Sequence, residues 1–258
     1  MIVIDPRAII DSGAHIADGV QIGPFSVIGG EVEIGPECMI GPHVVIKGPT
    51  RIGRGNRIYQ FASIGDDPQD KKYRGEPTRL EIGDDNTIRE YCTLNRGTVQ
   101  DQGVTRIGSR NWIMAYVHIA HDCVLGDDIV MANNASLAGH VQIEDCAILG
   151  GFAMVHQFCK IGAHAFLQFA AGVNRDVPPF VVASGIPARP AGLNTEGLRR
   201  HGFDVDRVGV LKKAYKLLYR SGLRLEQARA ELAALAVDHP DVARFSHFLE
   251  SNPRSIIR

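Results

Sequence analysis

Aliphatic residues recur at every sixth position along most of the chain. The series runs from Ile10 to Ile64, from Ile82 to Leu94 and, after one shift of phase, from Ile107 to Val173. An α-helix repeats every 3.6 residues and a flat strand every two, so a period of six predicts short strands separated by corners. Coils of this kind stack and bury their aliphatic side chains in one core. We therefore expect a mainly β structure, a parallel β-helix, over residues 1–189.

The six-residue period resembles that of hexapeptide-repeat proteins. In those proteins three hexapeptides form one coil, and the coil is left-handed, although crossovers between parallel strands are generally right-handed. The period itself fixes neither the number of hexapeptides per coil nor the hand. A left-handed β-helix with three hexapeptides in each coil is thus what the resemblance implies.

Two polar segments interrupt the repeat. The first, about residues 66–79, is rich in charged residues, Pro and Gly, so it should project from the coil as a loop. The second falls near Val99–Thr105. Projecting loops of solenoids often carry function, but a plain spacer is an alternative for the first segment.

After Pro187 the six-residue period stops and helical spacing begins. Apolar residues at helical intervals predict helices over about 205–218, 225–235 and 242–248, with Asp204 as the first cap and Gly222 as a stop. We expect residues 190–258 to form a small α-helical domain that covers the last coil. Between Glu196 and Leu225 there are eight Lys or Arg residues against three acidic ones. This local excess is either a solvated helix face or a docking surface for an acidic protein or a phosphate.

Composition and charge narrow the class of protein. Of the 258 residues, 45% are apolar, 7% are aromatic and 28 are Gly, which fits a β-rich chain with an aliphatic core. The net charge is −1, so no overall basic surface indicates nucleic acid as a partner. The N-terminal residues lack a basic segment followed by a long apolar one, and no window approaches about 18 apolar residues. We expect a cytoplasmic protein without a membrane span.

The five cysteines are odd in number and include no CxxC pair. This pattern argues against a disulfide framework or a structural zinc site and fits a reducing compartment. Four of them occupy the small-residue position of the hexapeptide, so we expect buried fillers there. These four are Cys38, Cys92, Cys123 and Cys159.

Histidines gather at one edge of the expected coil. If one coil holds three hexapeptides, His121, His140 and His156 lie near one edge on successive coils, about 4.8 Å apart per coil. Gly139 and Gln157 fall in line with His121, and His118 belongs to the same region. Such a cluster can supply a base near neutral pH and hydrogen-bond donors for an oxyanion. Asp122 could act on His121, although adjacent strand residues normally point to opposite faces.

Three functions compete for this cluster. A metal site would use three histidines with an open position, as in hexapeptide-repeat carbonic anhydrases. Because His121 and His156 are about 10 Å apart in one subunit, that site would need a ligand from a neighbouring subunit. Acyl transfer with histidine as general base needs no metal. A non-enzymatic scaffold would leave the histidines and the polar loop unexplained.

Ten short runs resemble one family specifically, the UDP-N-acetylglucosamine O-acyltransferases of lipid A biosynthesis. They extend over essentially the whole chain: Gln60–Gly65, Gln69–Tyr73, Gly75–Thr78, Asn95–Thr98, His118–Cys123, Ala132–Asn134, Leu137–His140, Val155–Phe158, Asp176–Pro179 and Tyr219–Gly222. The resemblance implies a homotrimer with active sites between subunits. It also implies transfer of a (3R)-3-hydroxyacyl group from the phosphopantetheine of acyl carrier protein to the 3-hydroxyl of UDP-N-acetylglucosamine, with no further cofactor and no metal.

The resemblance also assigns roles to individual residues. His121 matches the general base, and the backbone N–H of Gly139 matches the oxyanion donor. Asp70 matches a residue near the hydroxyl of the acyl chain. The remaining matches are positions that hold the substrate or its nucleotide end: Lys72, His118, His140, His156 and Gln157 for the former, Asn194, Glu196 and Arg200 for the latter. The basic stretch would then meet acyl carrier protein, which is acidic.

Counting by three hexapeptides also draws a track through Asn133, Gly151, Phe169 and Pro187. In the family, the position of Phe169 acts as a ruler for the acyl chain, with Gly permitting longer chains and bulkier residues shorter ones. We therefore expect a medium-length hydroxyacyl chain, with Asn133, Gly151 and Phe169 lining its track.

One position departs from the family pattern. The family commonly has His in the run that matches Thr93–Thr98, and Asn95 stands there in this chain. The acceptor could therefore be a 3-amino sugar nucleotide, acylated to an amide, rather than the 3-hydroxyl. The hydroxyl acceptor is the prediction we favour.

Overall fold

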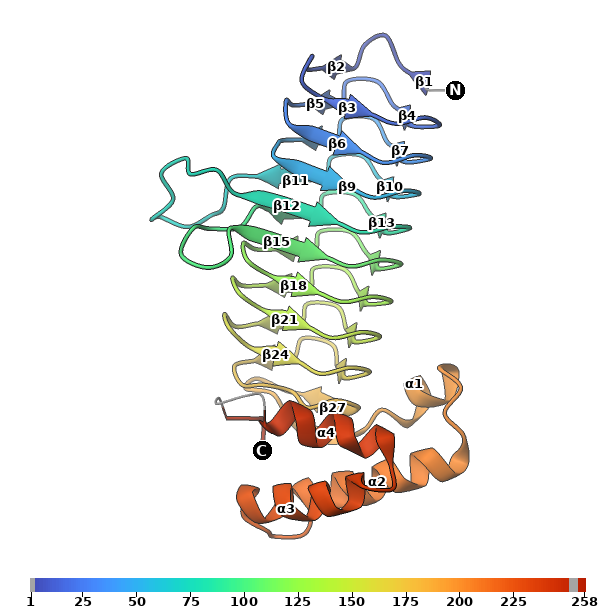
Figure 1. Ribbon diagram of the computed structural model, residues 1–258, viewed down its shortest axis with the longest axis vertical. Helices are drawn as coiled ribbons and strands as arrows, with labels where there is room; N and C mark the ends of the chain where they lie inside the picture. Colours follow the sequence, from blue (N-terminus) through green and yellow to red (C-terminus); the bar gives the residue numbers. More distant parts are fainter. Residues whose placement is uncertain (1–2, 251–254) are drawn as a thin grey trace.

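The computed structural model describes residues 3–250 and 255–258 and shows a long prism of stacked coils with a helical cluster at its C-terminal end (Figure 1). Each coil contributes one short strand to each of three sheets, and all strand pairs but one are parallel. Because each sheet is one flat side of the prism, three corners separate the sheets. The parallel β-helix expected from the six-residue period is therefore confirmed.

Up to residue 173, each of the three sheets takes every third strand of the chain, and the last two strands are added to the first sheet. The first holds β1 (Val3–Ile4), β4 (Gln21–Ile22), β7 (Met39–Ile40), β10 (Arg57–Ile58), β13 (Thr87–Ile88), β16 (Trp112–Ile113), β19 (Val130–Met131), β22 (Ile148–Leu149), β25 (Phe166–Leu167), β27 (Val181–Ser184) and β28 (Arg189–Leu193). The second holds β2 (Ile9–Ile10), β5 (Val27–Ile28), β8 (Val45–Ile46), β11 (Ser63–Asp66), β14 (Thr93–Asn95), β17 (His118–Ile119), β20 (Ser136–Leu137), β23 (Met154–Val155) and β26 (Gly172–Val173). The third holds β3 (His15–Ile16), β6 (Val32–Ile34), β9 (Thr50–Ile52), β12 (Arg79–Ile82), β15 (Val104–Ile107), β18 (Val124–Leu125), β21 (Gln142–Ile143) and β24 (Lys160–Ile161).

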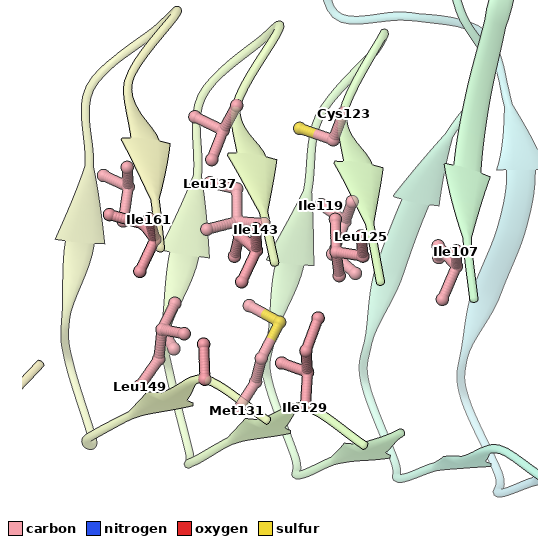
Figure 2. Close-up of a cluster of buried hydrophobic side chains, with 14 of the residues drawn as sticks. Ile107, Ile119, Cys123, Leu125, Ile129, Met131, Leu137, Ile143, Leu149 and Ile161 are labelled. Carbon is pink, nitrogen blue, oxygen red and sulfur yellow. The ribbon is translucent and has the colours of Figure 1, made fainter. Parts of the chain in front are cut away.

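Through the middle of the prism, each core residue pairs with the one that lies three hexapeptides further along the chain. Ile107 pairs with Leu125, Leu125 with Ile143, and Ile143 with Ile161. Figure 2 shows these side chains stacked inside the coils, and all four are at most 3% exposed. The core is thus an uninterrupted column of aliphatic side chains, as the periodic pattern predicts.

Each corner turns through a residue with positive φ. We call the corner between the first and second sheets the first corner, that between the second and third sheets the second corner, and that between the third and first sheets the third corner. Their positive-φ residues include Tyr116, Asn134 and Phe152 at the first corner, Asp122, His140 and Phe158 at the second, and Asp128, Cys146 and His164 at the third. The left-handed backbone region is unfavourable for residues other than Gly. The backbone hydrogen bonds of the sheets on both sides therefore hold each corner in this conformation.

The two interruptions of the repeat lie at the second corner. Residues 67–78 connect β11 to β12, and residues 96–103 connect β14 to β15. Both segments project from the same side of the prism in Figure 1. Residues 67–78 thus form a loop outside the coils, and the second loop stands beside it.

Four helices follow the coils. They are α1 (Thr195–Arg200), α2 (Val205–Tyr219), α3 (Leu225–Ala236) and α4 (Pro240–Glu250). Asp204 caps α2 by accepting a 2.8 Å hydrogen bond from the Arg207 N–H, as predicted. Phe245 of α4 packs against Phe180 of the last coil, with ring centroids 5.4 Å apart. The helices thus cover the open end of the aliphatic core.

The end of the β-helix differs from the periodic expectation in two ways. Leu167 pairs with Ala183 rather than with the residue three hexapeptides further on, so the prediction that Pro187 continues the track of Phe169 is wrong. The chain then turns back as β28, antiparallel to β27, and forms the short helix α1, neither of which the sequence pattern indicated. The domain boundary after residue 189 stays a prediction.

The cysteines in the small-residue position are buried. Cys146 lies one residue before that position and is partly exposed. Among the helices in the described part of the chain, none combines the length and the apolar run needed to cross a bilayer.

The aliphatic column predicts a large cost for removing one of its members. Replacing Ile143, 3% exposed, by Ala should lower the free energy of unfolding by about 2–5 kcal/mol, because the cavity cannot collapse between two fixed coils. Gln142→Ala, in the same strand but facing solvent, should change it by less than about 0.5 kcal/mol. Urea denaturation at one protein concentration measures both, and equal effects of the two variants would contradict the inward and outward assignment.

Candidate active site

His121 lies at the second corner in contact with a buried carboxylate. Its Nδ1 is 2.9 Å from Oδ2 of Asp122. The two residues are adjacent in sequence, and in a regular strand their side chains would point apart. Asp122 has a φ of 58°, which breaks the alternation and turns its carboxylate toward the imidazole. The contact that the strand rule disfavoured is therefore present, because these residues form a corner.

Asp122 is only 4% exposed and holds the second projecting loop as well as His121. The backbone N–H of Thr98 donates to Oδ1 at 2.9 Å, and the Thr98 hydroxyl donates to Oδ2 at 2.6 Å. Burial alone would raise the pKa of Asp122, but the hydrogen bonds from His121 and Thr98 outweigh it and hold that pKa below its usual range. The carboxylate is thus ionised and fixes the orientation of the imidazole.

Gly139 lies directly beneath the His121 ring. A Cβ at this position would be 2.4 Å from Cε1 of His121, so no side chain fits while the ring keeps its place. Gly139 is buried, and within the described chain no backbone carbonyl accepts a hydrogen bond from its N–H. The arrangement places a backbone donor next to the imidazole.

His140 forms the other wall of the site. Its Nδ1 is 2.9 Å from Oδ2 of Asp101, in the second loop, and its ring stacks on Phe158 at 4.4 Å. The rings of His121 and His140 are perpendicular, with centroids 5.1 Å apart. His140 is therefore fixed on two sides and faces the imidazole of His121.

A cavity of about 620 Å³ opens between the two loops and this corner. It brings together five of the residues expected from the sequence and five others: Asp70, Lys72, His121, His140 and Gln157, with Gln69, Thr98, Gln100, Asp101 and Phe158. Grooves of about 730 and 790 Å³ run along the N-terminal coils, but the lining of neither includes a residue of the histidine cluster. The polar cavity at the second corner is thus the candidate active site.

His118 and His156 lie outside the lining of this cavity. Nδ1 of His118 is 2.7 Å from the hydroxyl of Thr93, and burial together with nearby His121 lowers its pKa. His156 is exposed, with Nδ1 3.2 Å from the backbone carbonyl of Gln157. His118 lies three residues before His121 on the same coil, and His156 directly precedes Gln157 of the cavity lining.

The residues expected at the nucleotide end lie elsewhere on the subunit. Asn194 is a buried cap of α1: its Oδ1 accepts from the Gly197 N–H at 3.1 Å, and its Nδ2 donates to the His164 carbonyl at the third corner. Glu196 and Arg200 form an exposed ion pair at 3.2 Å on the same helix. In Figure 1, α1 is on the side of the prism opposite the projecting loops. One subunit does not bring these residues to His121.

The expected acyl-chain track occupies the remaining corner. Asn133, Gly151 and Phe169 stack at the first corner, where a Cβ on Gly151 would be 3.4 Å from the Asn133 carbonyl oxygen and 3.7 Å from the Phe169 ring. Phe169 is 72% exposed. The three sets of expected residues therefore lie at three different corners of one subunit.

The carbonic anhydrase alternative requires three histidines around one metal. His121, Asp122 and His140 do have ligand atoms within 4.8 Å of one another. However, both oxygens of Asp122 already accept hydrogen bonds from Thr98 or His121, and His156 is not in this group. A three-histidine site does not fit the described residues of one subunit.

Asn95, the departure from the family pattern, is buried beneath the first loop. Its Nδ2 donates to the backbone carbonyl of Asp67 at 2.7 Å. Arg96 reaches the same loop through Asp67 and through the Tyr73 hydroxyl at 2.9 Å. The amide of Asn95 thus holds the base of the loop that carries Asp70 and Lys72.

The hexapeptide-repeat β-helix and the histidine–carboxylate pair at its corner indicate an acyl-transferring enzyme. The family described as bacterial transferase hexapeptide matches residues 13–48, 31–66 and 105–139, and the one described as UDP N-acetylglucosamine O-acyltransferase, domain 2, matches residues 176–257. The chain is 59% identical over 258 residues to the acyl-[acyl-carrier-protein]–UDP-N-acetylglucosamine O-acyltransferase of Thiobacillus denitrificans, with all of both chains covered. The corresponding protein of Alkalilimnicola ehrlichii is 60% identical over 255 residues, 99% of each chain. The chain belongs to the UDP-N-acetylglucosamine O-acyltransferase family.

Solved structures of this family have the same fold. The UDP-N-acetylglucosamine acyltransferase of Francisella novicida superposes with a TM-score of 0.97 at 43% identity, covering 99% of this chain and 94% of the other. The UDP-N-acetylglucosamine O-acyltransferase of Moraxella catarrhalis gives 0.96 at 48% identity, covering 99% of both. The expectation of a left-handed parallel β-helix with a small helical C-terminal part is confirmed.

The bonds made by Asp122 predict a pH-dependent contribution to stability. Asp122→Asn should lower the free energy of unfolding at pH 7 by about 1–3 kcal/mol, because buried donors lose their charged acceptor. Since the folded-state pKa lies below the unfolded one, this stabilisation is complete above about pH 4 and is lost as the pH falls through the folded-state value. The difference between wild type and variant should therefore narrow in acid.

Asp101→Asn is the matched control, because Asp101 also contacts a histidine but is exposed. It should cost less than about 1 kcal/mol at pH 7. Urea unfolding at pH 7 and at about pH 2, below the unfolded-state pKa of a carboxyl group, measures both variants. An Asp122→Asn penalty that is equally large at both pH values would count against an ionised Asp122.

Proposed function

We propose that the protein transfers a (3R)-3-hydroxyacyl chain from acyl carrier protein to the 3-hydroxyl of UDP-N-acetylglucosamine, the first step of lipid A biosynthesis. The full-length identity to acyltransferases of that name supports the reaction. The observation that carries the mechanism is the His121–Asp122 pair above Gly139. Together these three residues supply a base, a group that orients it and an oxyanion donor.

In this mechanism the Asp122 carboxylate accepts a hydrogen bond from Nδ1–H of His121, which leaves Nε2 as the free base. Nε2 removes the proton of the sugar 3-hydroxyl while that oxygen attacks the thioester carbonyl carbon. The backbone N–H of Gly139 donates to the developing oxyanion. When the carbonyl re-forms, the C–S bond breaks, and the proton on His121 passes to the leaving phosphopantetheine sulfur.

Neighbouring residues position the substrate in this proposal. Asp70 and Lys72 approach from the first loop, Asp70 toward the hydroxyl of the acyl chain. His118, His140, His156 and Gln157 surround the sugar and the thioester. No cofactor is needed beyond the phosphopantetheine that carries the acyl chain, and the proposal assigns no metal to this site.

The active site is completed by neighbouring copies of the chain. Asn194, Glu196 and Arg200 lie near the third corner, and Asn133, Gly151 and Phe169 lie at the first, away from His121 at the second. In a cyclic homotrimer every interface joins one surface of a subunit to a different surface of the next. The first and third corners are the two edges of the first sheet, so the second corner of one subunit can face both of them across one interface. A trimer therefore joins the base, the nucleotide contacts and the acyl track, which one subunit keeps apart.

Acyl carrier protein would dock near the basic part of α2. Lys212, Lys213 and Lys216 are exposed along this helix, as is Arg220 at its end. Exposed cations of this kind steer an acidic partner. The cytoplasmic location stays a prediction.

The hydroxyl acceptor is favoured by the position of Asn95. The Nδ2 of Asn95 donates to the Asp67 carbonyl of the first loop. The residue that replaces the family's His therefore supports this loop instead of contacting the sugar. Transfer to a 3-amino sugar nucleotide is the second candidate, and the same assay decides between the two.

Mixing the protein with a 3-hydroxyacyl–acyl carrier protein and UDP-N-acetylglucosamine should yield the O-acylated product, identified by mass spectrometry. The same assay with the 3-amino sugar nucleotide should yield little of the amide. His121→Ala should lower kcat by about 10²–10⁴-fold, the usual contribution of a general base. His15→Ala, an exposed histidine on an N-terminal coil, should leave the rate unchanged. Acylation of neither acceptor, or full activity of His121→Ala, would refute the mechanism.

The position of Phe169 predicts selectivity for chain length. Phe169→Gly opens the track beside Gly151 and should shift the preferred donor toward longer chains, since the ring no longer blocks it. Competition assays with a series of acyl carrier protein thioesters measure the shift. Phe152→Gly is the matched control, because Phe152 is the neighbouring aromatic residue at the same corner, and it should leave the chain-length profile unchanged. An unchanged profile for Phe169→Gly would disprove the ruler.

A further inference from the structure

A second group of metal-ligating side chains lies at the third corner, far from the histidine site in the fold. Cys146, His164 and His201 each offer one ligand atom, and these atoms lie within 4.8 Å of one another. Cys146 and His164 are the positive-φ residues of successive coils, and His201 is the residue that ends α1. The β-helix and the helical region thus each contribute to one cluster.

The buried member of this cluster has an unused polar atom. His164 is 8% exposed, and its Nδ1 has no hydrogen-bond partner among the described residues. Buried polar atoms are rarely left unpaired, because an unmade hydrogen bond costs free energy. Its ring packs between Phe180 at 5.7 Å and Phe203 at 5.3 Å, so the imidazole is fixed in position. A fixed, unpartnered imidazole beside a thiol is a donor set that suits a soft or borderline cation.

We propose that Cys146, His164 and His201 bind one Zn²⁺ ion, with solvent as the fourth ligand. Thiolate and imidazole are the ligands that zinc prefers in a tetrahedral site. From zinc–ligand bond lengths of about 2.0–2.3 Å, ligand atoms of such a site lie about 3.3–3.7 Å apart. The ligand atoms, which lie within 4.8 Å of one another, must therefore approach to this spacing, and the exposed ring of His201 is the one with room to move.

His164 is already neutral and able to bind a cation, whereas Cys146 must lose a proton to do so. Burial, with neighbouring His201 and Arg244, lowers the pKa of His164 to about 4, so its imidazole is neutral and can bind a cation. Burial raises the pKa of the Cys146 thiol, so zinc binding must displace its proton to solvent as the Zn–S bond forms. No oxidant or other reactant is needed for this step.

The ion would fasten α1 to the coils. Asn194, at the start of α1, already donates to the His164 carbonyl, and His201 ends the same helix. Zinc at the cluster would thus hold both ends of α1 to the third corner. If the proposed function is correct, this helix presents Glu196 and Arg200 to the nucleotide of a neighbouring site, but the metal site itself does not depend on that assignment.

Titrating the tag-free, metal-stripped full chain with Co²⁺ tests the proposal. We expect one Co²⁺ per chain with a thiolate-to-cobalt charge-transfer band, displaced by Zn²⁺. Cys146→Ser should abolish the band. His201→Gln should weaken cobalt binding at least about tenfold, because loss of even a residue that only orients a metal ligand lowers metal affinity by at least about that factor. His15→Gln, an exposed histidine on a distant coil, should change neither.

Thermal unfolding gives an independent readout. Zn²⁺ at about 100 times its Kd should raise the melting temperature by about 5–10 °C in the wild type and not in Cys146→Ser. Circular dichroism confirms that the variants fold, which the exposure of His201 and the similar size of Ser should allow. A missing thiolate band, a band retained in Cys146→Ser, or cobalt binding abolished only by His121→Ala would overturn the proposal.

Discussion

The stacking of one aliphatic side chain on the next, at a register of three hexapeptides per coil, is the constraint on which the rest of the molecule depends. Ile107, Leu125, Ile143 and Ile161 show it directly, since each pairs with the next one and all are buried. A shift by one residue would turn the core outward, so the register is strongly specified. Because the register is fixed, every corner residue has a fixed neighbour on the coils before and after it.

The chemistry of the site comes from the corners rather than the strands. Positive φ at Asp122 turns its carboxylate back to His121, and the absence of a side chain at Gly139 lets the ring lie over the next coil. Both projecting loops leave at this corner and are tied to it, one by Asn95 and the other by Asp122. The β-helix therefore works as a rigid frame in which corner geometry, not strand alternation, decides which side chains meet.

Most of the fold and part of the site could be predicted from the sequence, because both follow from the six-residue period. The six-residue period identifies the side chains that are buried in the core. Counting by three hexapeptides then places His121, Gly139 and His140 together. The pairing of His121 with Asp122 was doubtful in the sequence because it depends on a backbone angle that no residue pattern reveals. Pro187 was misplaced because the last coil is shorter than the coils of three hexapeptides before it, since Leu167 pairs with Ala183.

The separation of the expected residues is equally informative. His121 at the second corner, Phe169 at the first and Arg200 close to the third lie on different parts of one prism, and no periodicity in a single chain describes the contacts of its copies. The homotrimer expected from the family resemblance supplies the missing step. The central claim is therefore that each active site is shared between neighbouring copies of the chain.

Subunit mixing tests that claim most directly. In trimers assembled at random from equal amounts of His121→Ala and Arg200→Ala chains, three quarters are mixed, and each mixed trimer has one junction where both residues are intact, so about a quarter of wild-type activity should return. Mixing His121→Ala with His140→Ala, two changes at the same corner, should restore none. Activity no greater than that of the two separate variants in the first mixture would contradict a shared site.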